Sequence, residues 1–184
     1  MPSSRGYLGA ACSKMSNRWV AFISDRIKCN YMVAQQSNRI EKNIILRAPR
    51  SRVWRALTTA SEFSQWFGGK DLGEFRAGAK IAGKVTTQGF EHVPLRFDIE
   101  RIEPETYFSY RWHPYAVDPN VDYSGEPMTL VEFHLADAPG GGTALRVVES
   151  GFDDIPPARR AEALKMNDAG WGYQLENIAR HVAT

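Results

Sequence analysis

Alternating apolar and polar positions dominate the middle of the chain. Between residues 91 and 102 four apolar side chains share one parity, while polar and charged side chains occupy the other. A period of two is typical of a β-strand with one buried and one solvated face. The same period recurs over residues 107–112, 129–135 and 143–150, and a shorter strand is expected at residues 80–85. The positions expected to face inward include Leu95, Phe97, Tyr110, Trp112, Phe133, Val147 and Glu149.

A strand and two short helices are expected before this region. Residues 40–46 form the first strand, because three of their apolar side chains share a parity and Pro49 follows them. Residues 53–57 and 63–67 then carry apolar side chains at helical spacing. The two glycines after Phe67 are expected to end the second of these helices.

The last stretch, residues 151–184, predicts one long helix that ends near Val182. Five of six positions at alternating spacings of four and three are apolar, so this face is expected to be buried. Gly170 and Gly172 each cost a helix interior roughly 1 kcal/mol relative to alanine. They predict that another part of the molecule approaches the backbone closely there. The six positions of the expected stripe are Leu164, Asp168, Trp171, Leu175, Ile178 and Val182.

Together these elements predict an α+β fold: a strand, two short helices, five or six antiparallel strands and a long helix. A single sheet with one apolar face needs the last helix to cover it. The loop at residues 114–127 contains three prolines and one glycine and is long enough for a lid or a cavity rim. We therefore expect function between the sheet and the last helix.

Charge and cysteine content limit the partners and the cellular compartment that we expect for the protein. Residues 1–31 carry five basic residues and one acid, a charge of +4, so the total of +2 leaves −2 for residues 32–184. This mildly acidic remainder makes nucleic acid an unfavourable partner. Cys12 and Cys29 both lie in the first segment, so no disulfide holds the expected domain, and a reducing cytoplasm is the natural setting. No apolar run has the roughly 18 residues of a membrane span.

Residues 1–37 are expected to be an N-terminal extension, and residues 38–184 the folded domain. The first 31 residues are basic, serine-containing and poor in acids, which resembles an organelle transit peptide. The alternative is a disordered tail or an artefact of start-site choice, with Met32 as the true start. We favour the alternative, because Met32 lies just ahead of the first patterned strand.

Several segments resemble the START-like (SRPBCC) superfamily, and within it the branch named after the activator of heat shock protein 90 ATPase homologue. The resemblance covers residues 38–182 and implies a helix-grip fold, in which a curved sheet grips the last helix and encloses an apolar cavity. Members bind lipids, hormones or polyketides; some are cyclases, and some bind chaperones. They share no catalytic residues that this chain could inherit. The matching residues are 48–58, 66–68, 149–152, Asn167, Gly170 and Trp171.

Two carboxyl groups stand out on faces expected to be buried. Glu149 ends an apolar strand face, and Asp168 interrupts the helix stripe. A carboxylate buried alone is costly, so each needs a partner, nearby solvent or a raised pKa. If both line one cavity, they form an acid/base or hydrogen-bonding pair for a polar ligand group. The alternative is that each is exposed at the end of an element or makes a structural cap.

Large aromatic side chains are expected around the same cavity. An aromatic pocket with a few polar groups suits a flat or lipid-like ligand, whereas the alternative for each side chain is ordinary core packing. The expected aromatic lining is Trp66 near the mouth, with Phe97, Tyr110, Trp112, Phe133 and Trp171.

The sequence lacks the motifs of metal binding, nucleotide binding and nucleophilic hydrolysis. The four histidines have no metal-ligand spacing, and the sequence contains neither a P-loop nor a nucleophile elbow. We therefore expect no metal, no cofactor and no identifiable catalytic residue. The leading hypothesis is non-catalytic binding of a small hydrophobic or aromatic ligand. The alternatives are a polyketide cyclase-like or other small-molecule enzyme using the same cavity, and a chaperone-associated interaction module. The oligomeric state stays open.

Overall fold

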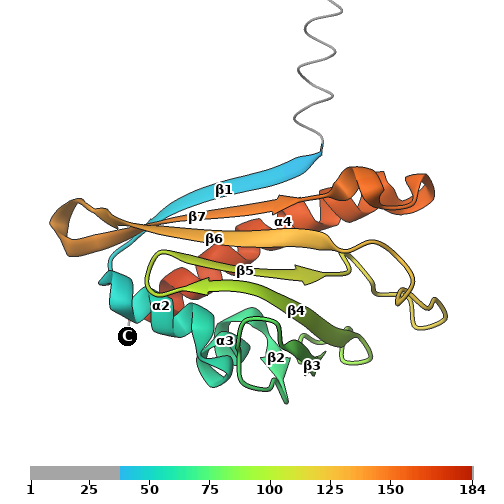
Figure 1. Ribbon diagram of the computed structural model, residues 1–184, viewed down its shortest axis with the longest axis horizontal. Helices are drawn as coiled ribbons and strands as arrows, with labels where there is room; N and C mark the ends of the chain where they lie inside the picture. Colours follow the sequence, from blue (N-terminus) through green and yellow to red (C-terminus); the bar gives the residue numbers. More distant parts are fainter. Residues whose placement is uncertain (1–37, 184) are drawn as a thin grey trace, which may run out of the picture. The chain divides into compact units, whose positions relative to one another are not determined.

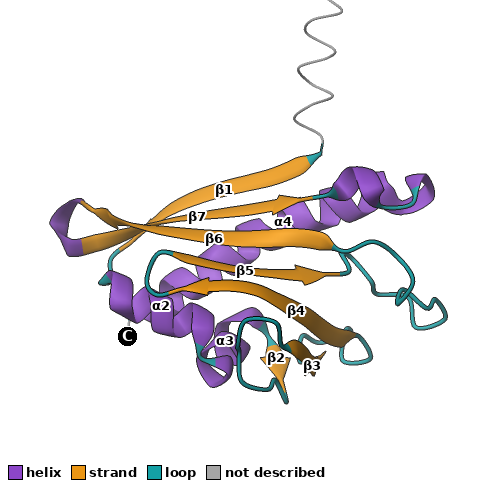
Figure 2. Cartoon of the chain, in the orientation of Figure 1, coloured by secondary structure: helices purple, strands orange, loops and turns teal. Residues whose placement is uncertain are grey.

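The computed structural model describes residues 38–183 and has the α+β architecture expected from the sequence (Figures 1 and 2). Two short helices follow the first strand, and a long helix ends the chain. The elements in order are β1 (Arg39–Leu46), α2 (Arg50–Thr58), α3 (Ala60–Phe67), β2 (Gly69–Lys70), β3 (Lys80–Val85), β4 (Pro94–Glu103), β5 (Tyr107–Trp112), β6 (Thr129–Ala138), the 3₁₀ turn η1 (Pro139–Gly141), β7 (Gly142–Ser150), the 3₁₀ turn η2 (Phe152–Asp154) and α4 (Pro157–Val182).

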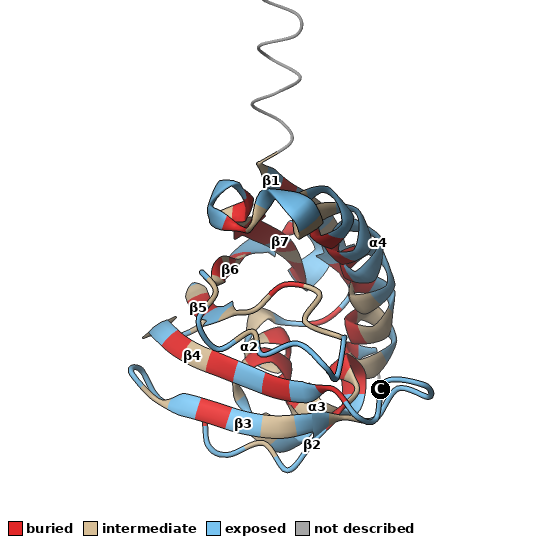
Figure 3. Cartoon of the chain, turned by 90° about the vertical axis from the view of Figure 1, so that its right-hand side faces the viewer, coloured by how far each residue is buried: buried red, intermediate tan, exposed pale blue. Residues whose placement is uncertain are grey.

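The seven strands form one antiparallel sheet in the order β1-β7-β6-β5-β4-β3-β2. Consecutive hairpins build β2 to β7, and β1 pairs with β7, with Arg39 opposite Ser150 and Leu46 opposite Thr143. A register shift in β4 between Ile99 and Arg101 marks a bulge, which bends a strand. Seen from the side, the strands follow an arc and α4 runs across its open side, with the buried positions between them (Figure 3). The helix-grip prediction is confirmed.

Local sequence explains where the helices begin and end. Pro49 precedes α2 in an extended conformation, and Pro157 occupies the first turn of α4, where a missing N–H costs nothing. Gly68 ends α3 at φ 84°, a left-handed conformation that glycine adopts without strain. The Trp66 indole then ties α3 to α2, because its Nε1 donates to the Ala56 carbonyl over 2.8 Å.

Strand parity predicted the core correctly. The inward side chains of β4 to β7 are buried, except the half-buried Trp112. Their rings contact one another, as in the 4.7 Å separation of the Phe97 and Tyr110 centroids. Such pairs add about 0.5–1.5 kcal/mol beyond burial of their area. The long β4 strand begins at Pro94 rather than near residue 91, because residues 90–93 form a turn closed by the Val93 amide and the Phe90 carbonyl.

The predicted face of the last helix was wrong over its first half. Asp168 is exposed, and Asn167 takes its place on the buried side. Ala163 likewise replaces the half-buried Leu164, because a small residue and an amide carry no hydrophobic signal. The buried residues of α4 are Ala163, Asn167, Trp171, Leu175, Ile178 and Val182.

The predicted close approach of another segment to the two glycines of α4 was also wrong. A Cβ atom added at Gly170 or Gly172 would meet nothing within 4 Å, so no neighbour requires the missing side chain. Gly170 instead borders an open pocket.

The predicted N-terminal extension, residues 1–37, lies outside the described residues, and the predicted domain division stays a prediction. In the region from residue 38 to residue 183, no helix combines the length and the apolar character of a membrane-spanning segment.

Candidate ligand-binding site

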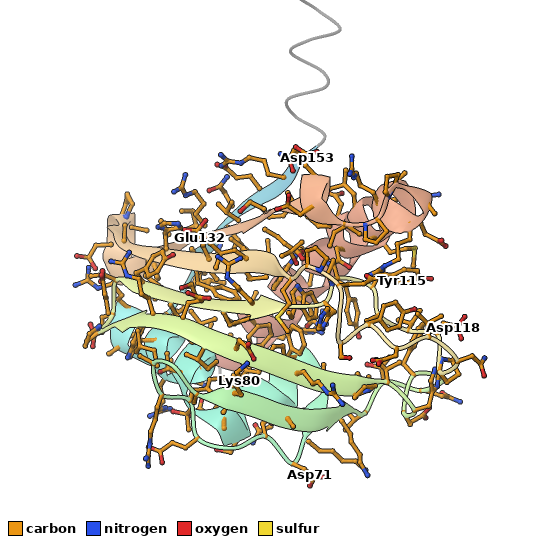
Figure 4. All side chains as sticks on the ribbon, turned by 45° about the vertical axis from the view of Figure 1, so that its right-hand side comes forward. Asp71, Lys80, Tyr115, Asp118, Glu132 and Asp153 are labelled. Carbon is orange, nitrogen blue, oxygen red and sulfur yellow. The ribbon has the colours of Figure 1, made fainter. Side chains whose placement is uncertain are left out.

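A pocket of about 510 Å³ opens between the sheet, the β5–β6 loop and α4. The loop leaves the ends of β5 and β6 at the side of the sheet remote from α2 (Figure 1). Tyr115 and Asp118 belong to this loop and to the pocket wall (Figure 4). The β3–β4 connection and the exposed flank of α4 complete the enclosure. The loop that the sequence predicted as a cavity rim therefore lines a cavity.

Apolar side chains gather at the mouth of this pocket. Among residues 38–183, five large hydrophobic side chains are exposed, and four of them border the pocket. Ile45 is the fifth and lies on β1. Exposed apolar side chains that gather around one cavity mark binding sites, whereas scattered ones need no explanation. The four at the mouth are Phe90, Val121, Met166 and Tyr173.

Glu149 lies behind the pocket wall and is fully buried. Its Oε1 accepts hydrogen bonds from Trp112 Nε1 at 2.8 Å and Thr129 Oγ1 at 2.6 Å. Its Oε2 accepts one from Trp171 Nε1 at 2.7 Å, and the Asn167 amide donates to both oxygens at 2.9 and 3.1 Å. Trp112 and Asn167 also border the pocket. We call these five residues the Glu149 cluster.

Burial dominates the electrostatics of the cluster. Loss of solvation raises the pKa of Glu149 above its ordinary value, and the hydrogen bonds that it accepts oppose this rise. Burial also raises the pKa of Tyr110 well above its usual range, with the negative charge of Glu149 adding to the effect. The Tyr110 hydroxyl is buried and has no hydrogen-bond partner within the described structure.

Arg159, in the first turns of α4, fastens the β5–β6 loop over the pocket. Its Nε donates to Glu126 Oε2 over 2.7 Å, and its Nη1 donates to the Pro114 carbonyl over 3.0 Å. The guanidinium also lies 4.8 Å from the centroid of the Tyr123 ring. Because these contacts reach both ends and the middle of the loop, Arg159 holds the whole β5–β6 loop in one position.

Two histidines strengthen the same wall. His92 Nε2 lies 3.0 Å from the Val117 carbonyl and so links the β3–β4 connection to the β5–β6 loop. His113 Nε2 lies 3.2 Å from the Glu126 carbonyl within the loop. Tyr115 adopts φ 48°, a left-handed conformation that a non-glycine residue keeps only when its surroundings hold it. The loop is therefore held in a defined shape beside the cavity.

Seven of the eight predicted site residues fall into three groups. Trp112 borders the pocket, and Glu149 and Trp171 lie immediately behind it in the Glu149 cluster. Trp66 of α3 is 4% exposed, and its indole bonds the Ala56 carbonyl of α2. Its expected place near the mouth of the pocket was therefore wrong. Three further aromatic residues belong to the packed interior and do not border this pocket: Phe97, Tyr110 and Phe133.

Asp168 does not join Glu149 in a shared cavity, and the proposed carboxylate pair was wrong. Its side chain is 53% exposed and pairs with Lys42 of β1, with 2.7 Å between Oδ1 and Nζ. One residue step turns a helix by about 100°, which carries Asp168 off the buried face that Asn167 occupies. The donor facing Glu149 is therefore an amide.

Several pocket residues were missed from the sequence. Asn167 is polar on a face chosen for its apolar residues, and loop residues such as Tyr115 and Tyr123 have no periodicity. The one available signal was the resemblance, which included Asn167 and Gly170. Between residues 38 and 183, no group of three His, Cys, Asp or Glu side chains is arranged to hold a metal ion.

The sequence model of the family described as Activator of Hsp90 ATPase homolog 1-like protein matches residues 47–183. The chain belongs to this family. The match covers the helices, the Glu149 cluster and the pocket, and it confirms the resemblance inferred from the sequence. No curated protein matches the chain.

Solved structures share the fold of this family member. Protein MLL2253 from Mesorhizobium loti is 22% identical, with a TM-score of 0.61 over 79% of this chain and 96% of that one. CalU16 from Micromonospora echinospora is 24% identical, with a TM-score of 0.55 over 78% and 75%. The Aha1 dimer from Colwellia psychrerythraea is 18% identical, with a TM-score of 0.55 over 75% and 90%. At these identities the likeness shows the fold alone.

Proposed function

We propose that the protein binds a small hydrophobic or aromatic molecule in the pocket between the sheet, the β5–β6 loop and α4, without transforming it. The observation that carries the proposal is a cavity of about 510 Å³ whose mouth gathers four exposed apolar side chains. Small-molecule sites typically have volumes of roughly 300–1,000 Å³ and mostly apolar walls with a few polar groups. This pocket meets both conditions.

The wall favours a flat ligand. Trp112, Tyr115 and Tyr123 contribute aromatic rings from β5 and the loop, and Phe90 and Tyr173 face the opening from other elements. Aromatic faces stack on flat apolar molecules and lose little conformational freedom in doing so. A polycyclic or aromatic molecule therefore suits this wall better than a long flexible chain.

Binding is favoured over catalysis because the two buried groups with raised pKa values, Glu149 and Tyr110, do not border the pocket. Glu149 is separated from it by Trp112 and Asn167, and its two oxygens accept hydrogen bonds from four side chains of the protein. Tyr110 lies among packed rings. A general acid or base has to reach the reacting atom directly or through one water. The histidines and aspartates that do border the pocket already bond the backbone of the wall, as His113 does at the Glu126 carbonyl. The cyclase-like alternative would have to free one of these groups.

Two further expectations remain proposals. A chaperone-associated role rests on the family name alone, and the described residues add no docking surface that favours it over ligand binding. A cytoplasmic setting rests on the absence of cysteine after residue 31.

A pair of glycine variants tests the binding site. Gly170 borders the pocket and Gly172 does not, although both lie exposed in α4 with open space at the Cβ position. Gly170→Leu places an apolar side chain in the cavity, and Gly172→Leu adds the same side chain elsewhere. Each variant gains about 1 kcal/mol of helix propensity, so both should melt roughly 2–4 °C higher than wild type.

The assay is an NMR titration with 2-naphthol, followed by amide shifts. We expect saturable shifts around the pocket in wild type and in Gly172→Leu, and at least tenfold weaker binding in Gly170→Leu. Because both variants keep the fold, the comparison isolates the cavity. Equal affinity in the two variants, or no saturable shift in wild type, would overturn the proposal. Native mass spectrometry of the purified protein then searches for a co-purified molecule.

A further inference from the structure

One amide in the pocket wall has a fixed orientation. Asn167 is 8% exposed, borders the pocket and donates through Nδ2 to both oxygens of Glu149. Rotating this amide by half a turn would bring Oδ1 to about the same 3 Å distance from two carboxylate oxygens. Two attractive contacts would then become two repulsive ones. Glu149 therefore fixes the orientation of the Asn167 amide: Nδ2 meets the carboxylate, and Oδ1 points away from it.

The amide oxygen that points away from Glu149, Asn167 Oδ1, is a hydrogen-bond acceptor. Asn167 Oδ1 has no hydrogen-bond partner in residues 38–183, and it is not among the fully buried unpartnered atoms. An accessible oxygen on a buried side chain that borders the pocket faces the pocket. A carbonyl oxygen accepts hydrogen bonds and cannot donate them.

Neighbouring polar side chains of the wall are already occupied. Gln174 donates through Nε2 to the Phe67 carbonyl at 2.9 Å and accepts through Oε1 from Asn177 at 3.1 Å. His92 and His113 each bond a loop carbonyl. The Asn167 oxygen is thus an acceptor held ready on the α4 side of the pocket.

We infer that Asn167 makes the pocket selective for apolar ligands that carry a hydroxyl group, phenolic or alcoholic, on the side that meets α4. The inference rests on the proposed function. The hydroxyl donates to Asn167 Oδ1, and Glu149 is the positioning residue that keeps this oxygen toward the ligand. A ligand with a carboxylate in the same place is disfavoured, because it would meet an acceptor with the Glu149 carboxyl behind it.

The test compares 2-naphthol with 2-methoxynaphthalene, which keeps the rings and the oxygen but lacks the donor. The readout is the ratio of their two dissociation constants, measured by NMR titration and compared between proteins. Intrinsic differences in hydrophobicity cancel in this comparison. We expect Asn167→Leu to shift the ratio about tenfold against 2-naphthol, the size of one good hydrogen bond. Asn43→Leu, the same substitution on an exposed position of β1 outside the pocket, should leave the ratio unchanged.

Glu149→Gln tests the positioning role. A glutamine there offers one oxygen and one NH₂ group, so the Asn167 amide is no longer held in one orientation. The ratio should move toward that of Asn167→Leu, although the Asn167 side chain is still present. An unchanged ratio in Glu149→Gln would overturn the positioning role.

A measurement on wild type covers the case in which Asn167→Leu does not fold. The side-chain NH₂ resonances of Asn167 should shift when 2-naphthol binds, and much less when 2-methoxynaphthalene binds. Similar shifts with both probes, or an unchanged ratio in Asn167→Leu, would overturn the inference while leaving the proposed function intact. Absence of saturable binding of either probe would overturn the proposed function and the inference together.

Discussion

Replacing Glu149 by alanine measures how much the cluster contributes to the fold. The change removes the acceptor for four donors, and two of these, on Thr129 and Trp171, belong to residues that are 0% and 3% exposed. Each buried donor left unpaired costs roughly 1–3 kcal/mol. Trp112 and Asn167 border the pocket, where water can replace the carboxylate. Because the variant also avoids burying a carboxylate, we expect a net loss of about 2–4 kcal/mol.

The pH dependence separates the charge of Glu149 from its hydrogen bonds, with Glu149→Gln as the isosteric reference. Burial raises the pKa of Glu149 in the folded state above the ordinary value of 4.5. Between these two pKa values the folded state holds more protons than the unfolded state, so stability falls as pH rises. The stability advantage of wild type over Glu149→Gln should be largest below about pH 4.5. It should shrink as pH rises through the folded pKa.

Urea unfolding followed by tryptophan fluorescence measures both effects, because Trp112 and Trp171 belong to the cluster. Curves at a series of pH values give the free energy of unfolding for wild type and both variants. A loss below 1 kcal/mol for Glu149→Ala would refute the hydrogen-bonding role. An advantage over Glu149→Gln that grows with pH would refute the dominance of burial, because it is the behaviour of a carboxylate with a lowered pKa.

Two further variants probe the loop and the helix surface. Arg159→Met should weaken 2-naphthol binding about five- to tenfold in the NMR titration, because it breaks the bond between α4 and Glu126 of the β5–β6 loop. The melting temperature should change little, since the core stays intact. Unchanged affinity would contradict the role of Arg159 in holding the loop. Asp168→Asn breaks an exposed pair with Lys42 and should cost at most about 1 kcal/mol in urea unfolding, with no effect on probe affinity; weaker probe binding would contradict its place outside the pocket.

Strand parity carried most of the fold prediction. One buried face per strand forces a period of two, so Phe97, Tyr110 and Glu149 could be placed inward without coordinates. The same logic located Glu149 as a buried carboxyl group that needed a partner. It did not identify the partners, because Thr129 and Asn167 come from elements whose register against β7 depends on the folded sheet.

The helix and the pocket show where sequence patterns lose information. On α4, Leu164 and Asp168 fit a hydrophobic spacing nearly as well as Ala163 and Asn167, and one residue step decides which pair is buried. Pocket shape depends on where the β5–β6 loop lies, and that loop is fixed by contacts such as Arg159 with Glu126, which join residues distant in sequence. Gly170 was interpreted as a close contact, whereas it borders open space.

The pocket wall and the folding core draw on different parts of the chain. Most of the wall comes from the β3–β4 and β5–β6 connections, whereas the Glu149 cluster lies on strands and on α4. Mutations can accumulate in the two connections without removing a donor from the cluster or a ring from the packed interior. Natural selection could therefore reshape the pocket through intermediates that all fold, which suits a fold that solved structures share with this chain at 24% identity or less.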